Sequence, residues 1–165
     1  MFYVRLRHEE AATVVDYLSR MVEGNIKLAT NQFTTAKFRD DAVNPGWDTK
    51  TPKESLLRAK AIIEPHLALF DCHDYYRPIE LFASIFCAQV LVGETCDAAE
   101  TYDQAARLHE NACDAHDVTT VFLDAIIQAV GAQATEKQRR LCVNAIPDKL
   151  DYDDCLKSLV SSGRV

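Results

Sequence analysis

The sequence predicts a mainly α-helical protein, a compact single domain of about six helices built around a central buried helical hairpin. The first helix of the hairpin is indicated by residues 79–92, where only Glu80, Ser84 and Gln89 are polar. A helix that is apolar on almost every side belongs in the middle of a packed domain. The second helix is indicated by residues 98–116, which are apolar on one face only. Elsewhere, apolar residues recur at steps of three and four, the period of amphipathic helices.

The composition fits a single domain that spans residues 1–165. A chain of this length buries about 70% of its unfolded surface when it folds. Because 48% of its residues are hydrophobic, it can form a core without a partner. No stretch resembles a secretory signal, so a cytoplasmic location is expected. The six cysteines include no CxxC pair and are expected to be reduced.

The charge distribution limits the classes of partner. The net charge is −7, and residues 1–60 carry 10 basic and 8 acidic side chains, whereas residues 61–165 carry 8 and 17. An acidic protein repels phosphate groups, so neither direct nucleic-acid binding nor adhesion to an anionic membrane is expected. A protein partner with a basic surface is the class that this charge favours.

The N-terminal segment combines a strand pattern with a helix pattern. Apolar and polar residues alternate over residues 2–7, the period of a half-buried strand. From His8 to Gly24 an apolar stripe predicts a helix that Gly24 ends. The stripe consists of Val14, Val15, Leu18, Met21 and Val22.

Residues 25–50 allow two interpretations. A helix would align Ile26, Ala29, Phe33 and Ala36, whereas a strand would align Thr34, Ala36 and Phe38. The propensities of threonine and phenylalanine favour the strand. Part of residues 26–38 then pairs with the N-terminal strand, and the fold gains a small β-strand pair.

A second helix is predicted to start at Thr51. Thr51 has the side chain of a helix cap, Pro52 suits the first helical position, and Glu54 stands three residues after the cap. Pro65 must end or kink this helix, because its ring clashes with the carbonyl four residues earlier. The loop of residues 71–77 then leads to the hairpin.

The hairpin has its own start and stop residues. Pro78 begins its first helix and Gly93 ends it. Asp97 and Glu100 have the spacing of a capping box and predict the start of the second helix. Beyond the hairpin, apolar stripes predict helices over residues 117–131, 135–147 and 151–160.

The spacing of the hairpin resembles that of one tetratricopeptide-type repeat. The matching positions are Phe82 and Ile85 on the first helix, Gly93 at the turn, and Ala98, Tyr102 and Ala105 on the second. The chain departs from that family at Phe86, where the family pattern has a small residue. No second copy occurs about 34 residues away, although such repeats stack on neighbours. The resemblance therefore implies a shared packing geometry and not membership of the family.

One cluster of side chains suggests a metal or thiol chemistry. His109, Cys113 and His116 recur at steps of four and three, so they share one helix face within reach of one ion. Zinc accepts imidazole and thiolate ligands, and a thiol paired with histidine is also the arrangement of a cysteine nucleophile. The simpler interpretation is packing, because these residues continue the stripe of Ala98, Tyr102 and Ala105. No nucleotide or catalytic loop motif is present, so no cofactor is expected and an enzyme is the less favoured class.

An acidic surface is the feature that indicates a function. The outward side of the second hairpin helix carries acidic residues and a single cation, Arg107; the acidic residues are Asp97, Glu100, Asp103, Glu110 and Asp114. A surface of one sign can dock on a basic partner. The 71–77 loop adds polar and aromatic contact candidates, of which Tyr75, Tyr76 and Arg77 are the foremost.

The sequence thus favours a non-enzymatic interaction protein, an adaptor or inhibitor that docks through the acidic helix face and the 71–77 loop. A small acidic helical protein also suits a viral or mobile-element inhibitor of a nucleic-acid-handling complex. One alternative is a metal-dependent or thiol enzyme that uses His109, Cys113 and His116. Another is a self-associating structural subunit, such as a homodimer that packs through the alanine-rich face or Trp47.

Overall fold

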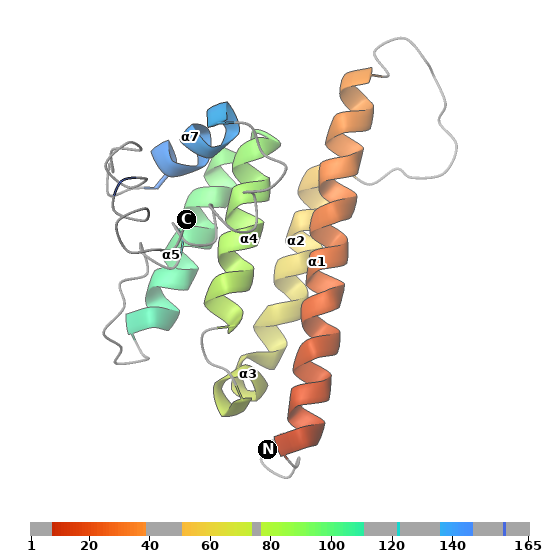
Figure 1. Cartoon of the computed structure of the whole chain (residues 1–165), viewed down its shortest axis with the longest axis vertical. Coiled ribbons are helices and arrows are strands. Elements are labelled where there is room, and N and C mark those ends of the chain that lie inside the picture. The colour runs from red at the N-terminus through yellow and green to blue at the C-terminus, as the bar shows by residue number, and fades with distance from the viewer. Residues whose placement is uncertain are drawn as a thin grey trace. The chain divides into compact units, whose positions relative to one another are not determined.

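The computed structural model describes residues 8–38, 51–73, 77–110 and 136–146, together with Phe122 and Lys157 (Figure 1). In this part of the chain the fold is mainly α-helical and contains no strand. The chain divides into two compact units, Met1–Leu81 and Phe82–Val165. No helix among the described residues is long and apolar enough to cross a membrane.

The longest helix, α1 (His8–Phe38), continues well past the glycine predicted to end it. Gly24 lies inside α1. Its backbone has an ordinary helical conformation, because among the described glycines only Gly93 has a positive φ. Residues 26–38 are therefore helical, and the strand interpretation of residues 34–38 is wrong. The predicted partner strand at residues 2–7 lies outside the described residues.

The second helix, α2 (Pro52–Ile63), runs back along α1 and packs against it (Figure 1). Its start confirms the predicted capping box: Glu54 N donates to Thr51 Oγ1 at 3.3 Å, and Thr51 N donates to Glu54 Oε2 at 3.0 Å. The facing stripes of the two helices are buried and comprise Ala11, Val15, Leu18, Val22 and Ala29 on α1 and Leu56, Ala59 and Ile63 on α2. Burial of apolar surface between them is the main stabilising term of this unit.

Pro65 ends α2, as predicted. The chain turns through one 3₁₀ turn, η2 (Glu64–His66), which contains the proline, and continues as α3 (Leu67–His73). α3 also contacts α1 and buries Leu69 and Phe70 completely. The break lets the chain change direction without giving up helical hydrogen bonding.

The predicted hairpin is present as α4 (Arg77–Leu91) and α5 (Thr95–Glu110). α4 is buried on nearly every side; its buried apolar residues include Ile79, Leu81, Phe82, Ile85, Phe86 and Val90. Gly93 lies in the turn with φ of 88°, a conformation that favours glycine. The boundary between the two compact units falls inside α4.

α7 (Glu136–Asn144) confirms a helix in the predicted range 135–147. Its Cys142 and Val143, and Ile146 just after it, are buried, whereas Leu141 is half exposed and does not face inward. The predicted helices at 117–131 and 151–160 lie outside the described residues except at Phe122 and Lys157. The exact number of helices and the single-domain organisation stay predictions.

Candidate interaction surface

The outward side of α5 presents exposed carboxylates on a helix whose opposite side is buried. Glu100 and Asp103 are exposed, whereas the inward residues Ala98, Thr101, Tyr102 and Ala105 are buried. The cation on this side, Arg107, uses its Nε to donate to the main-chain oxygen of Asp103 at 3.3 Å. We call Glu100 and Asp103, with Asp97 at the margin, the acidic face of α5.

Asp97 does not have the position that its spacing predicts. α5 begins two residues earlier, at Thr95, so Asp97 lies in the first turn and is not the cap. Its main-chain oxygen accepts a hydrogen bond from Thr101 Oγ1 at 2.9 Å, as expected inside a helix. Asp97 is half-buried. An acidic residue in the first turn still favours the helix, because it interacts with the positive end of the helix dipole.

Three aromatic rings hold the inner side of α5 in place. The centroids of Phe86 and Tyr102 lie 6.2 Å apart, and Phe122 makes edge-to-face contacts with both, at 5.2 Å from Phe86 and 5.0 Å from Tyr102. These separations are within the favourable range for aromatic pairs. The cluster connects α4, α5 and Phe122. The helix that carries the acidic face is therefore packed firmly on its inner side.

A buried polar contact also ties α5 to α4. Thr101 Oγ1 donates to Gln89 Oε1 at 2.7 Å, and it shares its single proton with the main-chain oxygen of Asp97. Both side chains are buried. Gln89 Nε2 has no acceptor within hydrogen-bonding distance in the described structure. Such a contact fixes the register of the two helices, because sliding one helix would leave a buried amide unpaired.

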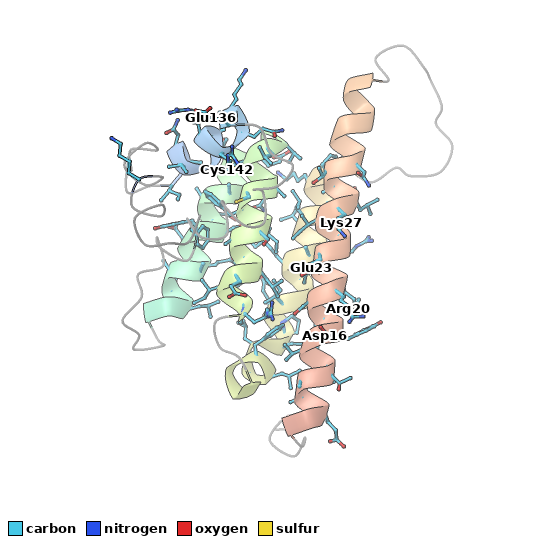
Figure 2. All side chains as sticks on the ribbon, in the orientation of Figure 1. Asp16, Arg20, Glu23, Lys27, Glu136 and Cys142 are labelled. Atoms are coloured by element: carbon cyan, nitrogen blue, oxygen red, sulfur yellow. The ribbon has the colours of Figure 1, made fainter. Side chains whose placement is uncertain are left out.

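Two buried cysteines meet where α7 packs on α4. Cys142, which is labelled in Figure 2, donates from Sγ to the main-chain oxygen of Cys87 at 3.8 Å, and both thiols are free. A hydrogen bond with the Cys142 thiol raises the pKa of Cys87 well above its ordinary value, and burial and the charge of the neighbouring sulfur raise it further. A thiol of raised pKa is a poor nucleophile. Cys87 is therefore suited to packing and not to covalent catalysis at neutral pH.

The predicted 71–77 loop is shorter than expected: residues 71–73 belong to α3 and Arg77 to α4, and only these ends are described. Arg77 begins α4 and forms an ion pair with Glu80, with 3.6 Å between Nη1 and Oε2. Both side chains are about half exposed, at 43% and 53%, so the pair contributes little stability. Tyr75 and Tyr76 lie outside the described residues, and their role as contact residues stays a prediction.

The proposed metal ligands also lie mostly beyond the described chain. His109 and Glu110 are the last residues of α5, but their side chains are not among those described, and Cys113, Asp114 and His116 lie outside. Within the described residues, no group of three or more His, Cys, Asp and Glu side chains could hold a metal ion. The prediction concerning His109, Cys113 and His116 is thus untested.

The structure also shows an apolar surface that the sequence pattern does not reveal. On α1, Tyr17, Met21 and Leu28 have exposed fractions of 63%, 39% and 37%, although all three are large and apolar. Met21 fits the predicted buried stripe because it lies next to Val22, but the structure leaves it on the outer side. The exposed residues follow the spacing 17–21–24–28, which runs parallel to the buried spacing 15–18–22–29, so spacing alone does not tell which stripe is covered.

Comparison with known proteins finds no matching family model, no matching curated protein and no matching solved structure.

Proposed function

We propose that this protein is a non-enzymatic interaction module, an adaptor or inhibitor, that docks on a protein partner through the acidic face of α5. The observation that carries the proposal is the exposure of Glu100 and Asp103 on a helix whose other side is fixed in the core. The 71–77 loop is a second proposed contact. The chemistry of the partner follows from the sign of this surface: it is basic.

Charge and rigidity both support docking at this face. Residues 61–165, which include α5, have an excess of nine acidic side chains, 17 against 8. The field of this region attracts a basic partner from a distance and raises the association rate. The aromatic cluster and the Thr101–Gln89 hydrogen bond fix the position of α5 relative to α4. A helix that is already ordered loses little entropy when it binds.

The class of partner that best fits is a protein that handles nucleic acid. The phosphate-binding surface of such a protein is basic, and a carboxylate surface competes for it. Docking there would inhibit nucleic-acid binding, the role expected of a viral or mobile-element inhibitor. A basic surface used only for protein assembly would instead make this chain an adaptor.

The test is a charge reversal on α5. Glu100→Lys combined with Asp103→Lys should remove the partner from an affinity purification of the tagged chain, identified by mass spectrometry. Asp97 is left unchanged because it is half-buried and its replacement would disturb the helix start. Capture by the wild type should also fall as salt is raised from about 50 to 500 mM, because exposed charges are screened over roughly 10 Å at 0.1 M.

A matched control separates this face from total charge. Glu64→Lys with Glu136→Lys changes the net charge by the same amount at two other exposed positions. Among the described residues, Glu136 forms an exposed ion pair with Arg140 and lies in the first turn of α7. The control should capture the partner as the wild type does. If the α5 variant is folded and captures the same proteins at the same level, docking through the acidic face is refuted.

A further inference from the structure

We propose that the outward side of α1 binds a second copy of this chain, with the two α1 helices antiparallel. This surface belongs to Met1–Leu81 and is separate from the acidic face of α5. It is also a different contact from the alanine-rich face and Trp47 that the sequence suggested for self-association.

The first observation is an apolar stripe that the fold leaves uncovered. Tyr17, Met21 and Leu28 are 63%, 39% and 37% exposed, and with Gly24 they recur at steps of four, three and four. These steps place them in one line along the helix, the seam spacing of paired helices. A Cβ added at Gly24 would meet nothing within 4 Å, so the surface there is open.

The stripe is complementary to itself when reversed. The steps four, three, four are the same in both directions, so a second, antiparallel copy places Tyr17 opposite Leu28 and Met21 opposite Gly24. The long Met21 side chain of each copy then faces the open surface at Gly24 of the other. Large against small is the arrangement that lets two helices interdigitate.

The second observation is a row of charges beside the stripe. Asp16, Arg20, Glu23 and Lys27 have the same steps and alternate in sign along α1 (Figure 2). Asp16 and Arg20 form an ion pair of 3.1 Å within the helix, with exposed fractions of 64% and 76%. Read from Asp16 to Lys27 the signs are negative, positive, negative, positive. In an antiparallel second copy the same row runs in the opposite direction, so each charge of one copy lies opposite a charge of the other sign.

The geometry of an antiparallel pair brings these rows together. When two antiparallel helices face each other across a two-fold axis, the row on one side of the seam meets the same row of the partner. Asp16 then lies opposite Lys27, and Arg20 opposite Glu23. In a parallel pair the charged row of one copy would instead face the opposite side of the partner's apolar stripe. Leu18 and Val22 lie on that side and are already buried in their own unit, so a parallel pair would not bring the charges together.

The interface is short, and the association is accordingly weak. From Tyr17 to Leu28 the stripe extends about 17 Å at 1.5 Å per residue, less than an interface of standard size requires. Dimers should therefore appear at protein concentrations of about 10–300 µM, which sedimentation velocity covers.

The experiment exchanges the signs of the charged row in two variants. An acidic variant carries Arg20→Glu and Lys27→Glu, and a basic variant carries Asp16→Lys and Glu23→Lys. Each alone places like charges opposite each other and should weaken self-association about tenfold or more. An equimolar mixture should restore association to at least the wild-type level, because opposite charges then meet. Met21→Lys should abolish it in every background.

Two controls identify the cause. Lys53→Glu with Arg58→Glu makes the same change of net charge on α2, at two exposed positions, and should associate as the wild type does. Glu100→Lys with Asp103→Lys should also dimerise normally, which separates this proposal from docking through α5. Circular dichroism establishes that each variant is folded.

Three outcomes would overturn the proposal. A wild type that is monomeric over the whole concentration range excludes the dimer. Variants that associate separately as the wild type does, or that lose association and are not rescued by mixing, exclude the antiparallel arrangement. A loss of thermal stability in Met21→Lys without a change in mass would show that the stripe is covered by the same chain and not by a second copy.

Discussion

The Cys142 thiol donates to the main-chain oxygen of Cys87 at 3.8 Å, across 55 residues of sequence. Both side chains are buried, with exposed fractions of 0% and 1%, so α7 is joined to α4 by a polar contact in an apolar setting. The Cys87 carbonyl belongs to a helix, and carbonyl oxygens accept a second bond readily because they have two lone pairs. The Cys87 thiol is thus stabilised as a neutral group.

The raised pKa of Cys87 makes stability depend on alkaline pH. In the unfolded chain a cysteine ionises near pH 8.5, whereas in the folded chain the Cys142 thiol and burial keep Cys87 protonated. Above that pH the folded state binds more protons than the unfolded state, so the free energy of unfolding falls as pH rises. Below it the full stability is present. The slope steepens above pH 8.5 toward the limit for one proton, about 1.4 kcal/mol per pH unit.

Urea denaturation from pH 7 to 10 measures this slope. Cys87→Ala should be less stable at pH 7 but should lose less stability toward pH 10 than the wild type. Val90→Ala is the control, because it removes buried apolar atoms from the same helix without removing a titrating group. Equal slopes in the wild type and in Cys87→Ala would show that Cys87 does not carry the effect.

The Thr101–Gln89 contact predicts a coupled pair of substitutions. Thr101→Val keeps the shape of the side chain and removes the donor to Gln89 Oε1, so a buried amide loses its partner at a cost of about 1–3 kcal/mol. Gln89→Leu in addition removes that amide. Chemical denaturation should therefore find the double variant less destabilised than the sum of the two single variants. Strict additivity would mean that the two side chains are not in contact in solution.

Two glycines in the described chain should respond to alanine with opposite signs. Gly24 lies inside α1 with room for a Cβ, so Gly24→Ala should raise the free energy of unfolding by about 0.5–1 kcal/mol. Gly93 has a positive φ, so Gly93→Ala should lower it by about 1–2 kcal/mol. Thermal denaturation of the dilute monomer measures both. A destabilising Gly24→Ala would mean that α1 is interrupted at this position.

The parts of the fold that the sequence predicts correctly are those set by neighbouring residues. The cap at Thr51, the break at Pro65 and the turn at Gly93 each depend on a few adjacent side chains. Gly24 is a misleading stop signal because a glycine costs a helix only about 1 kcal/mol, and the burial of Ala29 beyond it favours continuation. Extending an existing helix is also easier than starting a strand, so the β propensity of residues 34–38 does not decide their structure.

The candidate surfaces are less predictable, because they depend on which side of a helix the fold covers. The acidic residues of α5 can be placed on one side from their spacing, yet Asp97 is half-buried at the margin of that side, in the first turn of a helix that begins at Thr95. Met21 fits a buried stripe as well as an exposed one, and only the packing of α2 on α1 separates them. No local pattern connects Cys87 with Cys142.

The aromatic cluster beneath α5 gives the sharpest test of the support for the acidic face. Phe122 is fully buried and touches both Phe86 and Tyr102, so Phe122→Ala should cost about 3–5 kcal/mol in the free energy of unfolding. Tyr17→Ala is the matched control, because Tyr17 is an aromatic residue with 63% exposure and its loss should change the monomer by no more than about 0.5 kcal/mol. Urea denaturation compares the two. If Phe122→Ala were as mild as Tyr17→Ala, the ring would not be part of the core, and α5 would lack the rigid base on which docking through Glu100 and Asp103 depends.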